Sequence, residues 1–348
     1  MARRVSRRLR LLAGVAVVLG IATVFVLAFD WRGVLAAFAR ADPGLMAVAA
    51  SAVIVAILAW AESQRRLLAR SSAVLSPARC TLVYAAGLFP RFALPVGYAS
   101  SILVLARLFQ RESDLSYEGS LAAVSIAEGL SVAASTVLGI AGVAALVLFA
   151  PVLPPAWRLP AGLALGASVV SLPVALAWYR RDLFERLRGG LEGAIEGAGG
   201  WIEARLGVGV PVRRIEGGID RYARRFTQVS EYRGTVARSF LLAALGWLAF
   251  AGALYASGLA IDLRIPPAVA LVVIAASGYA NVLPVPGGLG GYEAVGAGAV
   301  YGFTGADPEA AIAAVLLFRA VSYWLPLALG GLATAYLSVE PRPAPRSE

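Results

Sequence analysis

The chain has 348 residues, of which 59% are hydrophobic and 15% are charged, and its mean hydropathy is +0.75. About 25% of the residues of a soluble domain are charged, so this composition is typical of an all-α, polytopic membrane protein. All 31 basic residues are arginine, the formal net charge is +10, and there is no histidine and one cysteine. These absences exclude a Ser-His-Asp triad, a histidine-bound metal, a Schiff-base lysine and an internal disulfide. We therefore expect no catalytic residues, no metal and no cofactor.

Six apolar runs are long enough to cross a membrane, because a helical span needs about 20 apolar residues. Two further apolar regions, 80–109 and 267–303, are interrupted by proline and glycine. Each half of these regions has about 12–17 residues, which is short for a span, so we predict two re-entrant helical hairpins. The six predicted full spans cover residues 9–29, 44–61, 117–150, 159–178, 238–260 and 308–337.

The arginines gather at the ends of the apolar runs, which indicates positive-inside orientation and not nucleic-acid binding. Five arginines precede the first span, and segments 62–79 and 179–238 are also rich in arginine. Segment 30–43 is neutral, and segment 304–309 carries acidic residues without arginine. We predict a multi-pass protein of a bacterial inner membrane, with a cytoplasmic N-terminus and no nucleic-acid partner.

The connector at residues 179–237 contains apolar side chains at helical spacing, with arginines between them. This pattern predicts a cytoplasmic amphipathic helix lying on anionic lipid. A regulatory or partner-binding surface is the alternative. The apolar residues are Ile215, Ile219, Tyr222, Phe226 and Val229.

A shift of 191 residues aligns two parts of the sequence. It places Pro95 on Pro286 and Gly97 on Gly288, at the centres of the two interrupted regions. The predicted topology brings the hairpins in from opposite sides, so we predict an inverted-topology repeat, as in many secondary transporters. The repeat halves are about 44–150 and 238–337, within a single transmembrane domain that covers residues 1–348.

Three charged residues lie inside apolar segments, where a charge is costly and therefore a functional candidate. They are Glu128, Glu293 and Arg319. Glu128 and Arg319 are equivalent under the 191-residue shift, so we predict that they form a buried pair or line one cavity. An ion pair that only fixes helix register is the alternative. Arg91, beside the first break, would either meet an anionic headgroup or extend to the cytoplasmic surface.

The second break reads "NVLPVPGGLGGYEAV" (residues 281–295). Its glycines allow close approach and positive φ, and the free amides at Gly287–Gly291 would form an anion site at the start of a half-helix. An ordinary turn between two short spans is the alternative, but such a turn would not explain Glu293.

These motifs resemble the lysylphosphatidylglycerol synthase transmembrane family. "LPVPGGLGGYEAV" is similar to its Pro-Gly-Gly-x-Gly-x-x-Glu signature, and the resemblance extends over about residues 10–338 through "LPVGYASSILVLARLF", "SLAAVSIAEGLS" and "AAVLLFRAVSYWLPLALGG". Together with the repeat, it implies that the substrate-binding residues are Pro286, Gly287, Gly288, Gly290, Glu293, Arg319, Glu128, Pro95, Gly97 and Arg91.

The resemblance implies a lipid flippase or transporter for an anionic or aminoacylated lipid, working through a site at mid-membrane. The family's soluble aminoacyl-transfer domain has no counterpart in the sequence, so we do not expect lysyl transfer. Three alternatives stay open: a non-catalytic subunit of a lipid or envelope biosynthesis complex, an intramembrane lipid-modifying enzyme, and an ion-coupled transporter of a small soluble substrate. Candidate partners besides the lipid are a second copy of the chain and a lipid-biosynthesis protein.

Overall fold

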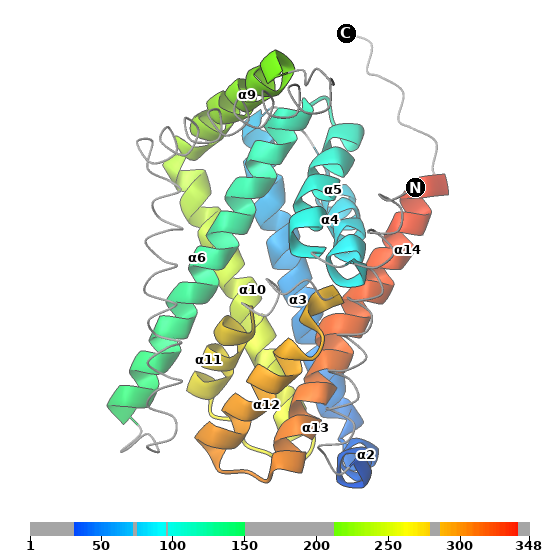
Figure 1. The fold of residues 1–348 in the computed structure, drawn as a ribbon, viewed down its shortest axis with the longest axis vertical. Helices are drawn as coiled ribbons and strands as arrows, with labels where there is room; N and C mark the ends of the chain where they lie inside the picture. Colours follow the sequence, from blue (N-terminus) through cyan, green and yellow to red (C-terminus); the bar gives the residue numbers. More distant parts are fainter. Residues whose placement is uncertain (1–30, 72–74, 95–96, 150–211, 279–285, 340–348) are drawn as a thin grey trace, which may run out of the picture.

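The computed structural model describes residues 31–71, 75–94, 97–149, 212–278 and 286–339, and this part of the chain is helical and contains no strand (Figure 1). The helices of its first half are α2 (Trp31–Arg40), α3 (Pro43–Leu68), η1 (Ala69–Ser71), α4 (Pro77–Ala93), α5 (Gly97–Glu112) and α6 (Tyr117–Phe149). Those of its second half are α9 (Val212–Ser230), α10 (Arg233–Leu259), α11 (Pro267–Gly278), η3 (Pro286–Gly288), α12 (Gly291–Thr304), α13 (Pro308–Arg319), η4 (Ala320–Trp324) and α14 (Leu325–Val339).

Several helices begin at a polar cap followed by proline. Asp42 accepts a hydrogen bond from the Leu45 amide at 2.9 Å at the start of α3, and Ser76 accepts one from the Arg79 amide at 3.2 Å at the start of α4. Proline suits the first helical position because it has no amide hydrogen to leave unpaired. The local sequence thus fixes where these helices begin.

Four segments of the described part are long and apolar enough to cross a membrane: Pro43–Ser71, Tyr117–Leu148, Arg233–Leu259 and Pro308–Val339. They confirm the spans predicted at 44–61, 117–150, 238–260 and 308–337. The predicted spans 9–29 and 159–178 lie outside the described residues, so the total of six stays a prediction.

Each interrupted region is a pair of packed helices, which we call hairpin 1 (α4 and α5) and hairpin 2 (α11 and α12). In Figure 1, hairpin 1 occupies the upper part of the molecule and hairpin 2 the lower part, beside helices that run the full length. α11 has 12 residues and α12 has 14, so at about 1.5 Å per residue they are shorter than the roughly 30 Å core of a bilayer. The re-entry of the hairpins into a membrane stays a prediction.

The 191-residue shift also aligns the helix boundaries. Adding 191 to the bounds of α3, α4, α5 and α6 gives 234–259, 268–284, 288–303 and 308–340, which are close to the bounds of α10, α11, α12 and the α13–α14 segment. In Figure 1, α6 runs downward from the end that carries α9, whereas α13–α14 runs upward. The two halves therefore repeat the same element order in opposite directions, although the inversion relative to a membrane stays a prediction.

The contacts between the halves are reciprocal. α4 of hairpin 1 packs on α14, and α11 of hairpin 2 packs on α6, so the first helix of each hairpin lies against the long helix of the other half. α3 and α10 pack along each other, where Ser63 and Ser239 each donate a hydroxyl hydrogen bond to the other's carbonyl oxygen, at 3.1 and 3.3 Å. This exchange places the end of α4 and the start of α12 near the middle of the bundle.

α9 includes Tyr222, Phe226 and Val229 of the predicted amphipathic segment. Ala223, Phe226 and Val229 are buried, and the helix packs on α6 and η1 at one end of the molecule. These three side chains are covered by the protein, and the lipid contact of the connector stays a prediction. Arg224 and Arg225 are exposed on the opposite face, while Arg221 forms a 2.7 Å ion pair with Glu118 of α6.

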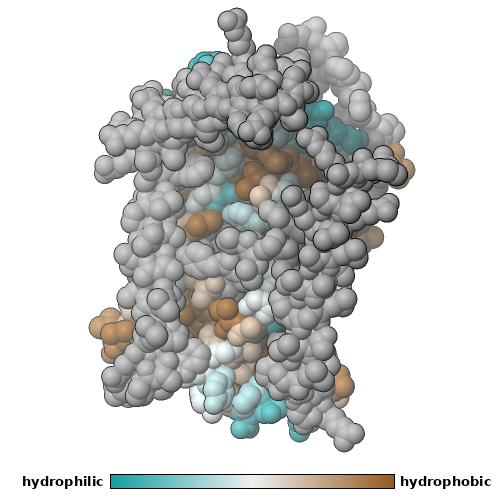
Figure 2. Space-filling model, in the orientation of Figure 1, coloured by the Kyte–Doolittle hydropathy of each residue, from teal (hydrophilic) through white to brown (hydrophobic). Residues whose placement is uncertain are grey.

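Hydrophilic residues gather at the ends of the described part. Figure 2 shows them at the lower end, where Asp262, Arg264 and Asp307 lie in the connections around hairpin 2. The α9 end carries many more arginines, among them Arg65, Arg66, Arg79, Arg111 and Arg233. This asymmetry is the one that the predicted orientation requires.

Candidate functional site

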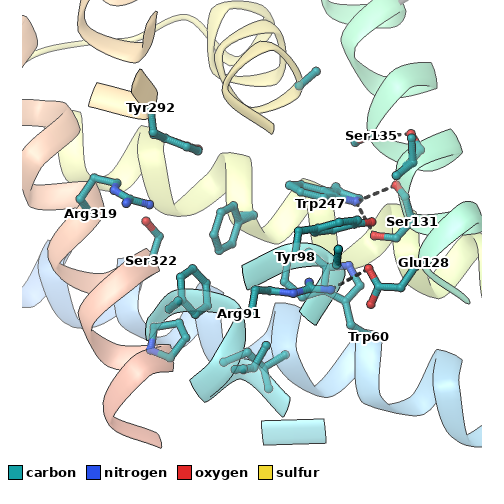
Figure 3. A pocket seen from close by; sticks show the side chains of 18 residues that line it. Trp60, Arg91, Tyr98, Glu128, Ser131, Ser135, Trp247, Tyr292, Arg319 and Ser322 are labelled. Carbon is teal, nitrogen blue, oxygen red and sulfur yellow. Dashed lines mark hydrogen bonds and ion pairs between the residues drawn. The ribbon is translucent and has the colours of Figure 1, made fainter. Parts of the chain in front are cut away.

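A cavity of about 460 Å³ lies in the middle of the bundle, where the two hairpins meet α3, α6, α10 and the α13–α14 segment. Its wall is mainly apolar and aromatic, and three charged side chains face it: Arg91, Glu128 and Arg319. Figure 3 shows Arg319, Tyr292 and Ser322 on one side and Glu128, Ser131, Ser135 and Trp247 on the other. An apolar pocket with a few convergent polar groups is the usual form of a ligand site.

Arg319 and Glu293 form a buried ion pair. The Nε of Arg319 donates to Oε1 of Glu293 at 2.7 Å, and the two side chains are 6% and 7% exposed. A second nitrogen of the same guanidinium, Nη2, donates to the Gly287 carbonyl at 2.9 Å. The planar fork of arginine suits two such bonds at once, so this residue joins α13 to the turn that precedes α12.

Two tyrosine rings enclose the Arg319 guanidinium, whose central carbon lies 4.7 Å from the Tyr292 ring centroid and 4.6 Å from that of Tyr323. Cation–π contacts of this kind gain strength when the site is shielded from water. Arg319 is therefore held from both faces, while its Nη1 has no hydrogen bond within the part of the chain that the structure describes. Since Arg319 lines the cavity, this edge is the one available to a ligand.

Glu293 caps the start of α12. Its Oε2 accepts a hydrogen bond from the Gly290 amide at 2.7 Å, which is the backward bond of a capping box. The expectation that these amides are free for an anion was therefore wrong at Gly290, because the chain's own carboxylate occupies that position.

The residues Pro286–Gly290, which we call the glycine turn, need glycine for two reasons. Gly287, Gly288 and Gly290 have φ values of 55°, 66° and 82°, which other residues rarely adopt. A Cβ on Gly287 would also lie 2.2 Å from the Tyr323 ring and 3.2 Å from the Phe92 ring. The turn is thus pressed between α4 of hairpin 1 and the helix after hairpin 2.

η4 is a single π-helical turn that follows Arg319 directly. Such turns interrupt the regular helix and occur frequently at functional sites. Here the turn carries Ser322, which lines the cavity, and Tyr323, whose hydroxyl donates to the Phe92 carbonyl at 3.2 Å. The Ser322 hydroxyl is buried and has no hydrogen-bond partner within the described residues.

Arg91 and Glu128 form the second ion pair of the cavity, with 2.7 Å between Nη2 and Oε2. This separation equals that between Arg319 and Glu293, so both pairs are formed. Nε of Arg91 donates to the Ser101 hydroxyl at 3.2 Å, and the guanidinium carbon lies 4.8 Å from the centre of the Tyr98 ring. This pair connects the tip of hairpin 1 to the middle of α6.

An aromatic wall lies beside Glu128. Trp60 and Trp247 meet edge to face with ring centroids 5.1 Å apart. The indole nitrogen of Trp247 donates to the carbonyl and the hydroxyl of Ser131, at 2.9 and 3.0 Å, and that of Trp60 donates to the Ala243 carbonyl at 3.3 Å. These bonds fix both rings, so the wall is rigid before any ligand binds.

Among the described residues that line the cavity, only Ala99 at the start of α5 and Val132 in the middle of α6 are exposed. Val132 is near the centre of α6, so this point lies on the side of the bundle and not at one of its ends. We call it the mouth of the cavity.

The family described as lysylphosphatidylglycerol synthase TM region matches residues 11–330. The chain belongs to this family. Both hairpins and the three charged residues that line the cavity lie within the matched range. Comparison with curated proteins gave no match.

Most of the residues predicted from the family signature lie at or beside this site. Arg91, Glu128 and Arg319 line the cavity, Glu293 stands directly behind Arg319, and Gly287, Gly288 and Gly290 form the turn that starts at Pro286. Gly97 begins α5 where a Cβ would lie 2.1 Å from the Arg91 carbonyl oxygen. Pro95 lies outside the described residues.

Of the two arrangements predicted for Glu128 and Arg319, the structure shows the shared lining of one cavity and not the buried pair. Arg319 binds Glu293 and Glu128 binds Arg91, each within its own half of the family domain. The reason is that α6 packs on hairpin 2 and on α10 and not on α13, so the two equivalent side chains have nearer partners.

Sequence reasoning missed the aromatic residues around the charges, namely Trp60, Trp247, Tyr292 and Tyr323. Tyr292 precedes Glu293 in the family signature, and Tyr323 follows Arg319 by one helical turn. An intramembrane arginine with a tyrosine four residues later is a usable signal for a cation–π contact. The π-helical turn has no such signal.

Proposed function

We propose that this protein is a lipid flippase or transporter, not an enzyme, and that it moves an anionic or aminoacylated lipid through the central cavity. The observation that supports the proposal most directly is the combination of a charged mid-height cavity with a lateral mouth. A headgroup entering this mouth would exchange water for fixed protein charges, while its acyl chains stay in the bilayer. Broken helices that meet at a central site are the usual plan of such carriers.

The phosphate of the lipid would bind the free edge of Arg319. That guanidinium is already oriented by Glu293, Gly287 and two tyrosine rings, so little side-chain freedom is lost when the ligand binds. Arginine binds phosphate through a fork of parallel hydrogen bonds, which are about twice as strong as uncharged ones. Arg91 can supply a second positive group, because its side chain also lines the cavity.

An ammonium group, as in an aminoacylated headgroup, would bind on the Glu128 side. The carboxylate lies there beside Tyr98, Trp247 and Trp60, and a cation in contact with aromatic faces and a carboxylate gains from both. Binding of the ammonium to Glu128 would release Arg91 toward the phosphate. The cavity would then distinguish a headgroup with both charges from one with a negative charge alone.

The proposal is tested by the transbilayer movement of fluorescent lipids in vesicles that contain the purified protein. The panel holds phosphatidylglycerol, an aminoacylated phosphatidylglycerol and phosphatidylcholine. Loss of one charge-assisted hydrogen bond corresponds to about a tenfold or greater change in affinity, so we expect Glu128→Gln to slow the aminoacylated lipid by about that factor and phosphatidylglycerol less.

Glu62→Gln is the control, because Glu62 pairs with Arg65 and Arg66 and does not line the cavity. It changes the net charge by the same amount and is expected to leave transport intact. Folded wild-type protein that moves none of the panel lipids would contradict the proposed function. Equal slowing by Glu128→Gln and Glu62→Gln would contradict the assigned site.

A further inference from the structure

The two ion pairs of the cavity share one equivalent position, at which the charge is reversed. Under the 191-residue shift Glu128 corresponds to Arg319, since 128 + 191 = 319. In the first half the hairpin supplies the arginine, Arg91, and the long helix supplies the glutamate. In the second half the hairpin supplies the glutamate, Glu293, and the long helix supplies the arginine. Each pair therefore ties one hairpin to the long helix that follows it.

The pair of the second half holds the glycine turn at both ends. Arg319 binds the Gly287 carbonyl and Glu293 binds the Gly290 amide, and the two side chains bind each other. Gly287 of the glycine turn lies against the ring of Tyr323, whose hydroxyl donates a hydrogen bond to the Phe92 carbonyl of hairpin 1. The Phe92 and Tyr323 rings also meet edge to face, with centroids 5.4 Å apart. One guanidinium thus keeps the tips of the two hairpins together.

The pair of the first half is more exposed. The side chains of Arg91 and Glu128 are 18% and 8% exposed and both face the cavity, whereas those of Arg319 and Glu293 are 6% and 7% exposed; each pair has a separation of 2.7 Å. The mouth of the cavity lies on the same side as Arg91 and Glu128, between α5 of hairpin 1 and α6. The structure therefore combines one buried pair at the glycine turn with one more accessible pair beside the mouth.

We propose that Arg319–Glu293 and Arg91–Glu128 are two latches that open in alternation; the structure shows both ion pairs formed. Opening of Arg91–Glu128 frees hairpin 1 from α6 at the mouth, and opening of Arg319–Glu293 releases the glycine turn from Tyr323 and Phe92. The ligand exchanges access between the two sides without passing both latches at once. The inference rests on the proposed function only for the identity of that ligand.

Cysteine labelling tests the latches without any transport assay. Ser322→Cys is placed in a Cys80→Ala background, which removes the single native cysteine. Ser322 is 1% exposed and precedes Tyr323, whose ring lies against the glycine turn, so a maleimide should react slowly. Ser257→Cys, which is 0% exposed in α10, reports any general loosening of the protein.

We expect Glu293→Gln to raise the labelling rate at Ser322→Cys at least about tenfold and to leave Ser257→Cys unchanged, because a state populated at 1–10% then becomes a major one. Arg319→Lys should act in the same direction, since lysine keeps the charge but lacks the fork that reaches Glu293 and Gly287 together. It also keeps the experiment informative if Glu293→Gln does not fold. Arg91→Gln, which breaks the other latch, should not raise labelling.

An unchanged rate in both latch variants, or an equal rise at Ser322→Cys and Ser257→Cys, would overturn the proposal. The second outcome would make the pair a structural support only. The result is separate from the function, because labelling that follows the latches in a protein that moves no lipid would sustain the latches and refute the flippase. Lipid movement together with a labelling rate that stays unchanged in the latch variants would support the flippase and overturn the latches.

Discussion

Gly139 and Gly330 are 191 residues apart and make the same contact in the two halves. A Cβ on Gly139 would lie 2.6 Å from the side chain of Ala275 in α11, and a Cβ on Gly330 would lie 2.6 Å from the Phe89 amide nitrogen in α4. Each glycine thus marks the point where a long helix crosses the first helix of the other half's hairpin. Small residues at such crossings let helices approach closely, which is the main source of packing energy between helices in lipid.

Gly330→Ala should therefore destabilise the protein, by about 1–3 kcal/mol, because the new methyl group meets the backbone at Phe89 and Ala85, which cannot rotate away. Thermal unfolding in detergent measures the effect. Gly331→Ala is the matched control, since its methyl group would touch only the Phe89 ring at ordinary contact distance, 3.6 Å. Equal melting temperatures for the two variants would show that the helix crossing at Gly330 can accommodate a methyl group.

Arg319→Gln should cost about 3–5 kcal/mol, because it leaves the buried Glu293 carboxylate without its positive partner. The double variant Glu293→Gln/Arg319→Gln should be more stable than Arg319→Gln alone, since no buried charge remains. Arg65→Gln provides the comparison, because its pair with Glu62 is about a quarter exposed and should contribute less than about 1 kcal/mol. A double variant that is no more stable than Arg319→Gln, or an Arg65→Gln variant that loses as much stability as Arg319→Gln, would contradict a buried pair.

Gly287→Ala should be among the most damaging single changes, costing about 2–5 kcal/mol. The residue has φ of 55°, and the added methyl group would overlap the Tyr323 ring. Gly298→Ala tests the specificity of the effect, because Gly298 lies inside α12 with open space around it. Alanine there should raise the free energy of unfolding by up to about 1 kcal/mol, because it favours the helix more than glycine does. A Gly287→Ala variant as stable as the wild type would mean that the glycine turn is not held in this conformation.

Phe226→Ala should release α9 from the bundle. The ring is 3% exposed, and its loss from a packed interior typically costs about 3–5 kcal/mol. Arg224 and Arg225 flank it on the exposed face, so trypsin should cut there faster when the helix detaches. Gln228→Ala, on the same helix but exposed, should leave the cleavage rate unchanged. Slow cleavage of both variants would indicate that other contacts hold α9.

Much of the fold could be predicted from the sequence because membrane proteins carry strong periodic signals. Apolar length located the four described spans, and the Pro/Gly breaks located the hairpins. The repeat was detected through Pro95/Pro286 and Gly97/Gly288, and the helix boundaries follow the same shift. These features depend on local composition, which the sequence states directly.

The contacts of the site were harder to predict because they depend on which helices are neighbours. Equivalence under the 191-residue shift related Glu128 to Arg319 but does not bring them together, since α6 and α13 are not packed on each other. The role of Glu293 as a cap for Gly290 depends on the turn conformation, and the π-helical turn at Ala320–Trp324 arises from tertiary packing. The family match adds the residues of the signature but not their partners.

If the proposed function holds, the position of the mouth between Ala99 and Val132 sets different limits on the two parts of a lipid. A headgroup would have to fit within about 460 Å³ beside two arginines and a glutamate. An acyl chain that stays outside the mouth would not have to fit the cavity, whatever its length. Such a protein would select lipids by the size and charge of their polar end and would accept a range of chain lengths.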